Sequence, residues 1–183
     1  MKKIMISIGL CLGFSVLMIL QMLVHGQKLT ANKIKTNVEK YSVYESKFAT
    51  MQVETSQKEK ITLKELKEEI VILNFWASWC TPCVAEFKSL NKLIEKYGKK
   101  IKVIGINNDT EDGKKEITKM ENKYSLKFPS VVDEEGNIAS SFNITRVPAT
   151  VVYHKGKVIH FSNEEFDFVN KKFTNLLESK LTL

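Results

Sequence analysis

The sequence predicts a domain of the α/β class, in which a central sheet carries helices on both faces. Short apolar runs alternate with stretches of helical apolar spacing, in the order strand, helix, strand, helix, strand, hairpin, helix. Residues 70–75 are apolar except for Asn74, as in a strand buried on both faces. The 183 residues begin with a long apolar segment. About 155 residues follow it, enough for one domain of ordinary size.

Composition excludes several classes of protein. Hydrophobic residues make up 43% of the chain, which excludes a disordered protein. Three cysteines, at positions 11, 80 and 83, are too few for a disulfide-stapled scaffold. The formal net charge is +7, but the lysines are scattered among 21 acidic residues, with no basic stripe interleaved with aromatic residues. We therefore expect no nucleic-acid partner.

Residues 4–24 are uncharged and almost wholly apolar, and Lys2 and Lys3 precede them. A helix of this length spans a bilayer core of about 30 Å, so residues 1–26 are predicted to form a membrane anchor. A cleaved signal peptide is the alternative. Its apolar stretch is shorter, about 7–15 residues, and Val24-His25-Gly26 is a weak cleavage pattern. Cys11 lies inside the run and is interpreted as a small apolar side chain.

The charges on the two sides of the apolar run do not decide its orientation, because lysines occur on both. Two lysines followed at once by an apolar run are typical of an export signal, and long domains translocate largely regardless of charge. We therefore expect a single-pass protein of the cell membrane, with a cytoplasmic N-terminus and an extracytoplasmic domain. Residues 27–47 are polar and lysine-rich and are predicted to form a stalk, and residues 48–183 the domain.

Local patterns predict the elements of the first half of the domain. We expect a strand over residues 48–54, a polar turn over 56–60 and a short helical stretch over 61–70. The buried strand follows over 70–75, and a second strand is expected over 101–107. Between the last two, apolar residues recur at three- and four-residue steps from Cys83 to Tyr97. This spacing predicts a helix that ends at Gly98.

In the second half, Asp109 or Thr110 is predicted to cap a helix that runs to about Tyr124. A short strand is then expected over residues 129–132, a turn over 133–136 and a short helix over 137–142. The two strands of a hairpin are expected over 149–153 and 158–161. Ser162 and Glu165 match a capping box. The last helix is predicted to bury Phe166, Val169, Phe173, Leu176 and Leu177.

Cys80 and Cys83 lie where the buried strand ends and a helix begins. Free backbone N–H groups and the helix dipole favour an anion at such a position. The pKa of the Cys80 thiol is therefore expected to lie below the usual value of ~8.5. Cys83 lies one helical turn further along and can attack the sulfur of Cys80, so the pair can exchange with a disulfide elsewhere. Pro82 suits the first turn of a helix, where a missing N–H costs nothing.

A zinc half-site and a structural disulfide are the alternatives for this pair. Zinc would need two further ligands, and His154 and His160 are separated by a hairpin turn, with no second cysteine pair in the sequence. A disulfide that closes so short a loop restricts the unfolded chain little. We expect neither a metal nor another cofactor.

The segment Asn74-Phe75-Trp76-Ala77-Ser78-Trp79-Cys80-Thr81-Pro82-Cys83, followed by Glu86-Phe87, resembles the active-site segment of membrane-anchored thioredoxin-like proteins of the TlpA/ResA type. The resemblance extends from about Phe48 to the C-terminus. It includes Val147-Pro148-Ala149-Thr150 and the hairpin that joins Tyr153 to Val158. The resemblance implies a thioredoxin-like fold with a mixed central sheet and an activity in thiol-disulfide exchange.

The same resemblance implies roles for individual residues. Pro148 matches the cis-proline that lies beside the two cysteines in thioredoxin folds, and the backbone of Val147 is then expected to pair with a bound substrate. Asn74 stands where thioredoxins themselves carry a buried, titratable aspartate. In ResA-like proteins a glutamate at the position of Glu86 neighbours the active site, so Glu86 is expected to tune the thiol pKa and relay a proton. A solvated surface glutamate is the alternative.

Two further residues are assigned to the substrate-binding surface. Trp79, directly before Cys80, is expected to form an apolar lip that excludes water and receives a partner. Pro82, between the cysteines, is assigned to the same surface. Trp76 is interpreted mainly as a packing residue, and Arg146 as an exposed surface residue.

The residue before the second cysteine favours a reductant. By resemblance, oxidising proteins of the DsbA type have histidine there, whereas this chain has Pro82, as in reducing proteins. We expect Cys80 and Cys83 to be held as thiols that reduce disulfides in exported proteins, for example apocytochrome c. Electrons would come from a membrane thiol transporter of the CcdA/DsbD type. A disulfide-forming oxidase or isomerase, and a non-catalytic thioredoxin-fold module for metal handling or docking, are the alternatives.

Overall fold

The computed structural model describes residues 17–27 and 41–181. The chain divides into two units, Met1–Ser42 and Val43–Leu183. In the first unit, residues 17–27 form a helix whose large apolar side chains are exposed. Among the described residues, no helix combines the length and apolar character that crossing a membrane requires. The remainder of the predicted anchor (residues 1–16) and residues 28–40 of the predicted stalk lie outside the described part of the chain.

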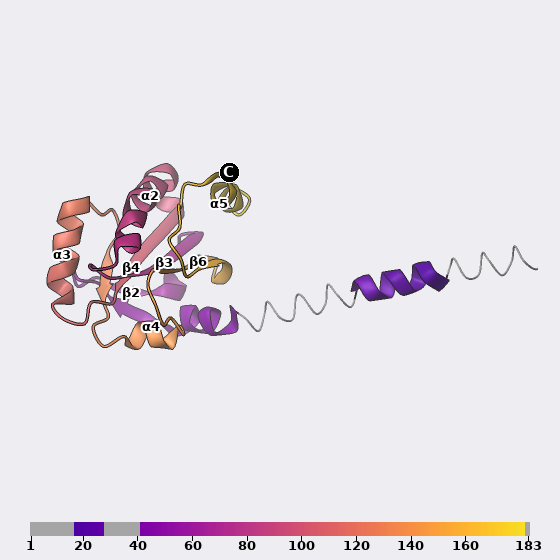
Figure 1. Ribbon diagram of the computed structural model, residues 1–183, viewed down its shortest axis with the longest axis horizontal. Coiled ribbons are helices and arrows are strands. Elements are labelled where there is room, and N and C mark those ends of the chain that lie inside the picture. The colour runs from indigo at the N-terminus through magenta and orange to yellow at the C-terminus, as the bar shows by residue number, and fades with distance from the viewer. Residues whose placement is uncertain (1–16, 28–40, 182–183) are drawn as a thin grey trace, which may run out of the picture. The chain divides into compact units, whose positions relative to one another are not determined.

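The second unit is built on a five-stranded sheet with the strand order β5-β4-β3-β6-β7 (Figure 1). Its strands are β3 (Ile70–Trp76), β4 (Ile101–Asn107), β5 (Ser130–Val132), β6 (Ala149–His154) and β7 (Lys157–Ser162). Strands β3, β4 and β5 are parallel, whereas β6 runs antiparallel to β3 and β7 antiparallel to β6. The predicted mixed sheet is therefore confirmed, including the hairpin between β6 and β7.

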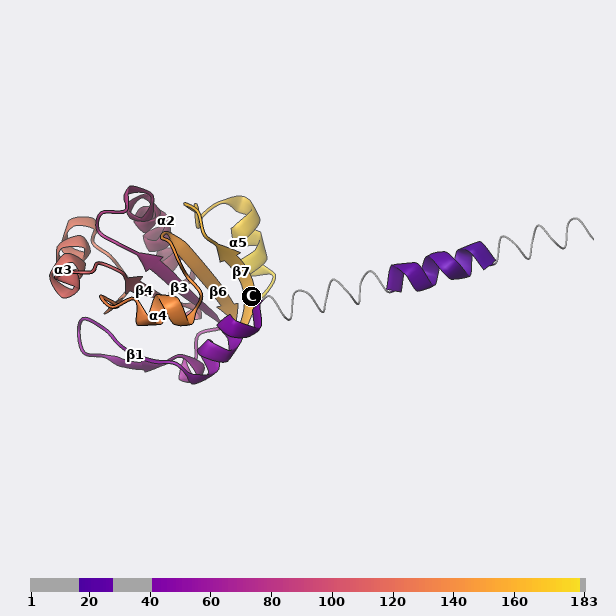
Figure 2. The same ribbon diagram turned by 60° about the horizontal axis from the view of Figure 1, so that its bottom comes forward.

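Alternate residues of β3 face two different cores, because successive side chains of a strand point to opposite faces. Ile72 lies in the core formed with helices α2 (Thr81–Tyr97), α3 (Gly113–Tyr124) and α5 (Lys171–Glu178). Leu73 lies in the core formed with α4 (Asn137–Ser141), Tyr44 and Phe48. Figure 2 shows the resulting layers, with helices on both sides of the sheet.

The chain before β3 differs in part from the sequence prediction: the strand expected over residues 48–54 is limited to Gln52–Glu54, and the helical stretch expected over residues 61–70 is mostly absent. Residues 41–50 are helical, because Tyr44 and Phe48 are one helical turn apart and both pack on the sheet side, with Phe48 stacked 4.6 Å from the ring of Tyr153. A small hairpin follows, with β1 (Gln52–Glu54) antiparallel to β2 (Lys60–Thr62). Between β2 and β3, the chain forms only a single 3₁₀ turn, Leu63–Glu65.

Both outer strands of the sheet are covered by segments from the start of the unit. Thr55 forms an isolated antiparallel bridge with Val131 of β5, and the N–H of Ser56 donates to the carbonyl of Ser130 (2.8 Å). At the other edge, Glu45 accepts a hydrogen bond from the N–H of Val158 (3.2 Å). The compact unit comprises Val43–Leu183 and so includes these covering residues.

Two predicted helix starts are wrong. Helix α3 begins at Gly113 with Asp112 as its N-cap, because the carboxylate of Asp109 is bound to Ser78 instead. Helix α5 begins at Lys171, where the side chain of Asn170 accepts a hydrogen bond from the N–H of Phe173 (2.9 Å). The side chain of Ser162, a residue of β7, bonds to the backbone of Glu164, so the predicted capping box does not form.

Candidate active site

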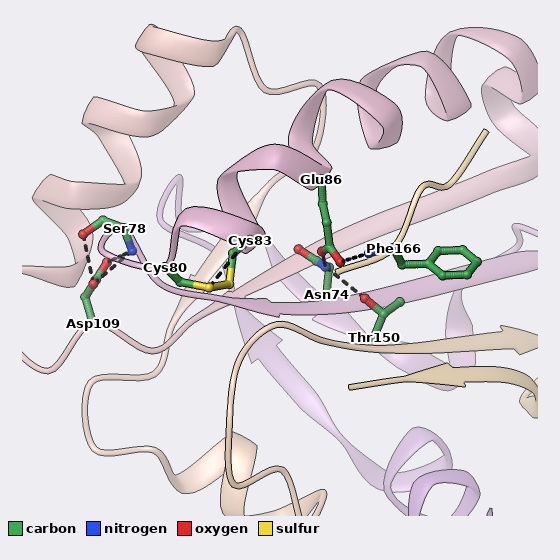
Figure 3. The surroundings of a disulfide bond; sticks show 8 residues. All are labelled: Asn74, Ser78, Cys80, Cys83, Glu86, Asp109, Thr150 and Phe166. Atoms are coloured by element: carbon green, nitrogen blue, oxygen red, sulfur yellow. Dashed lines mark hydrogen bonds between the residues drawn. A yellow bond between two sulfur atoms is a disulfide. The ribbon is translucent and has the colours of Figure 1, made fainter. Parts of the chain in front are cut away.

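Cys80 and Cys83 are joined by a disulfide at the N-terminus of α2 (Figure 3). Strand β3 ends at Trp76, and a short turn places Cys80 as the N-cap of the helix, where its sulfur accepts a hydrogen bond from the N–H of Cys83 (3.3 Å). Cys80 is 4% exposed, whereas Cys83 is fully buried. When the disulfide opens, this N–H and the positive end of the helix dipole stabilise a thiolate on Cys80.

The peptide bond between Val147 and Pro148 is cis, as predicted. Ala149 pairs with Phe75 in the sheet, so Pro148 lies beside the chain that leaves β3 toward the cysteines. Pro148 is buried, and the half-buried Val147 packs against the core cluster that contains both cysteines. The structure therefore brings the predicted proline segment to the same end of the sheet as the cysteine pair.

The two tryptophans of the motif have different environments. Trp79 is 71% exposed, and Pro82 is also exposed, so both lie on the surface next to the buried sulfur of Cys80. Trp76 is fully buried, and its ring meets the edge of Phe87 at 5.2 Å, as expected for a packing residue. Arg146 is exposed.

Glu86 is a buried member of a polar network and not a solvated surface residue. Only 1% of it is exposed, and one carboxylate oxygen accepts from the side-chain amide of Asn74 (2.8 Å), while the other accepts from the N–H of Phe166 (2.8 Å) (Figure 3). The same amide nitrogen of Asn74 donates to the hydroxyl of Thr150 (3.0 Å). The network thus joins α2 to β3, to β6 and to the segment before α5.

Burial raises the pKa of Glu86 from 4.5 to about 7. The hydrogen bonds from Asn74 and Phe166 stabilise the charged form and lower this pKa, whereas the charge of Glu165 raises it further. Near neutral pH, the carboxyl group therefore exists in both protonation states. Because Glu86 follows Cys83 by one helical turn, it can take up and release a proton beside the cysteine pair.

Asp109 is a buried carboxylate near the cysteines whose contacts the sequence analysis missed. Both of its oxygens accept from the N–H of Ser78 (3.1 Å each), and one also accepts from the Ser78 hydroxyl (3.0 Å). A fourth hydrogen bond comes from the side chain of Asn107 (2.7 Å). The available signal was the polar run Asn107-Asn108-Asp109 at the carboxyl end of a buried strand parallel to β3, since ligands bind at this end in parallel sheets.

His160 belongs to an aromatic cluster beside the Glu86 network. Its ring lies 4.7 Å from that of Phe166 and 5.3 Å from that of Phe173. Burial and the nearby charge of Lys172 lower the pKa of His160. The neutral ring therefore helps to pack the segment whose backbone holds Glu86.

Curated proteins with similar sequences carry names from thiol-disulfide chemistry. The thioredoxin-like protein YneN of Bacillus subtilis (strain 168) is 33% identical over 108 residues, which cover 58% of this chain and 63% of YneN. The thiol-disulfide oxidoreductase ResA of Bacillus cereus (strain ATCC 10987 / NRS 248) is 38% identical over 103 residues, which cover 55% of this chain and 58% of ResA. The match therefore spans less than two thirds of either relative.

Solved structures and a family model agree on the fold. StoA from Bacillus subtilis superposes with a TM-score of 0.58 at 21% identity, covering 69% of this chain and 95% of StoA. A secreted Mycobacterium tuberculosis disulfide oxidoreductase homologous to E. coli DsbE gives 0.60 at 21% identity, covering 72% and 98%. These likenesses show a thioredoxin-like fold. The model of the AhpC/TSA family matches residues 45–162, and the chain therefore belongs to the AhpC/TSA family.

Proposed function

We propose that this protein is an extracytoplasmic thiol-disulfide oxidoreductase that reduces disulfides in exported proteins through Cys80 and Cys83. The observation that carries the proposal is the cysteine pair at the N-terminus of α2, with the segment of Pro148 at the same end of the sheet. The names of the relatives YneN and ResA support the same chemistry.

The reaction consists of two exchange steps. The Cys80 thiolate attacks one sulfur of the substrate disulfide, a bond forms between the two proteins, and the other substrate sulfur leaves as a thiolate that takes up a proton. Cys83 then loses its proton and attacks the sulfur of Cys80. The disulfide between the cysteines forms, and the second substrate sulfur leaves. The substrate gains two electrons and two protons, and the dithiol loses them.

We propose that Glu86 acts in the second step. Cys83 is fully buried, so water does not easily accept its proton. The carboxylate of Glu86 is buried one helical turn away, with a pKa of about 7. It is therefore a suitable base for Cys83 during reduction of a substrate, and its protonated form returns the proton when the disulfide is reduced again.

The direction of exchange is proposed from Pro82, the residue before the second cysteine, because oxidising proteins of the DsbA type have histidine at this position. The structure holds the pair as a disulfide, a form through which both directions of exchange pass. A reduction potential near the −270 mV of thioredoxin supports a reductant, whereas a value near the −120 mV of DsbA would identify an oxidase. Equilibration of the cysteine pair with glutathione and dithiothreitol buffers measures this potential.

The membrane anchor and the electron source complete the proposal. The length of the apolar run, residues 4–24, supports a single-pass anchor. The export-signal pattern of two lysines followed at once by this run supports a cytoplasmic N-terminus. A domain outside the cytoplasm needs electrons from inside, so we propose a membrane thiol transporter of the CcdA/DsbD type as the donor. Apocytochrome c, whose cysteines must be reduced before haem attachment, is one candidate among exported substrates.

Trapping the mixed disulfide tests the proposed function. A Cys83→Ser variant of the full chain lacks the attacking group of the second step, so it is expected to accumulate a disulfide between Cys80 and its substrate. The adduct is detected as a dithiothreitol-sensitive band, and mass spectrometry identifies the attached protein. The double variant Cys80→Ser, Cys83→Ser is the control. Equal adduct formation by the control, or none by either variant, would contradict the assignment.

A further inference from the structure

We propose that Asp109 is a positioning residue for protein substrates, because its carboxylate fixes the turn that presents Trp79 beside Cys80. This inference rests on the proposed thiol-disulfide exchange and extends it to the recognition of the disulfide-bearing partner. Three observations carry it: the unused polar groups of the turn, the burial of Asp109, and the exposure of Trp79.

The turn Ala77–Cys80 joins β3 to α2 and is closed by a hydrogen bond from the N–H of Cys80 to the carbonyl of Ala77 (3.1 Å). A turn of this kind uses only its first carbonyl and its last N–H, so its two central residues contribute no hydrogen bond of their own. These central residues are Ser78 and Trp79. Without a further contact, the turn would be fixed only at its two ends.

Asp109 supplies the missing contact. Its two oxygens accept from both donors of Ser78, the N–H and the hydroxyl, at 3.0–3.1 Å (Figure 3). Asp109 is 4% exposed and is itself held by Asn107 at 2.7 Å. Because hydrogen bonds to a charged group are stronger than neutral ones, these three bonds tie the turn to the loop after β4.

The cysteine and the tryptophan depend on this contact to different degrees. Cys80 is held from the helix side as well, because its sulfur accepts from the N–H of Cys83 and its carbonyl accepts from the N–H of Val84 (3.1 Å). The ring of Trp79 is 71% exposed and makes no aromatic or hydrogen-bond contact within residues 41–181. The position of the Trp79 ring is therefore set by the backbone of the turn, which Asp109 fixes through Ser78.

This difference separates large substrates from small ones. A protein disulfide must meet the Trp79 surface and the sulfur of Cys80 together, whereas a small disulfide needs only the sulfur. Misplacing a positioning element by about 1 Å can slow a reaction by up to 10²-fold. Loosening the turn is thus expected to slow reaction with a protein disulfide much more than reaction with a small one.

Asp133 provides a matched control for the substitution. It is also a buried carboxylate after a strand (5% exposed), and it accepts from two backbone N–H groups, those of Ile138 and Ala139 (2.9 Å each), and from the side chain of Asn108 (2.9 Å). Its backbone partners belong to α4 and not to the cysteine turn. Asp133→Asn therefore removes a comparable charge and leaves Ser78 in place.

The experiment compares Asp109→Asn with Asp133→Asn and the unchanged protein, all as full chains with reduced cysteines. Single-turnover rate constants are measured with insulin as the protein disulfide and with glutathione disulfide as the small one, by acid quenching and thiol counting. A pH of about 9.5, above the usual thiol pKa of ~8.5, keeps changes in thiol ionisation out of the comparison. We expect Asp109→Asn to slow the insulin reaction on the order of tenfold, and the glutathione reaction by less than about twofold.

The possible outcomes separate the two proposals. If the unchanged protein reacts with neither disulfide, the proposed function itself fails. If it reacts but Asp109→Asn matches Asp133→Asn, or slows both reactions equally, Asp109 has only a structural role and the inference is wrong. Should Asp109→Asn not fold, Ser78→Ala removes the hydroxyl contact alone. Ser78→Ala is expected to slow the insulin reaction and not the glutathione reaction, with a smaller effect than that of Asp109→Asn. Ser78→Thr keeps the hydroxyl and is expected to react with insulin as fast as the unchanged protein.

Discussion

The buried carboxyl group of Glu86 links the pH of the solution to the stability of the fold. Its pKa rises from 4.5 to about 7, chiefly because burial disfavours the charged form. The folded protein thus binds this proton more tightly than the unfolded chain does. The resulting stabilisation is fully present below pH 4.5 and is lost as the pH rises through about 7.

Glu86→Gln is expected to remove this pH dependence, because glutamine stays neutral at every pH. Between about pH 4.5 and pH 8, the free energy of unfolding of the variant should gain up to about 3 kcal/mol relative to the unchanged protein. Urea denaturation of both proteins over this pH range measures the difference. A difference that stays constant with pH would show that Glu86 titrates as it does in the unfolded chain.

The same substitution is expected to change the reactivity of the thiols. Above pH 7 the charged Glu86 opposes a second negative charge on Cys83, so Glu86→Gln should shift the pH profile of thiol alkylation to lower pH, by about one unit or less. Iodoacetamide alkylation, followed by mass spectrometry, resolves the two cysteines. An unchanged profile would remove Glu86 from the proposed proton transfer.

For individual residues, the sequence predicts a role where the chemistry is visible in a local motif. The Cys-x-x-Cys spacing of Cys80 and Cys83 predicts their exchange chemistry directly, whereas the roles predicted for Glu86 and Pro148 come from the resemblance to TlpA/ResA-type proteins. Asp109 could not be assigned in this way. Its partner Ser78 is 31 positions away in the sequence, and only the parallel pairing of β3 with β4 brings the two together.

Among the elements, predictions succeeded where several turns repeat one pattern and failed where tertiary contacts decide the end. The helix from the cysteines to Tyr97 was predicted because its apolar stripe repeats over 17 residues. The starts of α3 and α5 were not, because Asp109 binds Ser78 instead of capping α3, and residues before Asn170 are bound to side chains of α2. The carboxylate of Glu86 holds the N–H of Phe166, and the hydroxyl of Ser89 holds the N–H of Phe168.

Two substitutions test whether Asn170 or Ser162 caps the start of α5. Asn170→Ala removes the side chain that accepts from the N–H of Phe173 and is expected to lower the free energy of unfolding by about 1 kcal/mol. Ser162→Ala, at the position that the sequence had suggested as the cap, should change it by less than about 0.5 kcal/mol. Urea denaturation measures both variants. A larger loss for Ser162→Ala than for Asn170→Ala would place the cap where the sequence put it.

For the whole molecule, the boundary of the folded unit determines which fragments are stable. A fragment that begins at Tyr41 keeps the contacts of residues 43–50 with the sheet and is expected to unfold at the same urea concentration as the full chain. A fragment that begins at Phe48 loses the ring contact of Tyr44 with Phe161 (5.3 Å) and the hydrogen bond from the hydroxyl of Tyr153 to the carbonyl of Tyr44 (3.1 Å). It should be less stable by about 2 kcal/mol or more. Equal midpoints for the two fragments would restore Phe48 as the boundary.

The covered sheet edges have a consequence for crowded solutions of this protein. An open outer strand offers a template on which another molecule can add a strand, and growth of this kind leads to aggregates. Here Thr55 and Ser56 already pair with β5, and Glu45 already binds the N–H of Val158 on β7. A neighbouring copy would have to displace these contacts before it could extend the sheet, so the segments that lead into the domain also protect it against polymerisation.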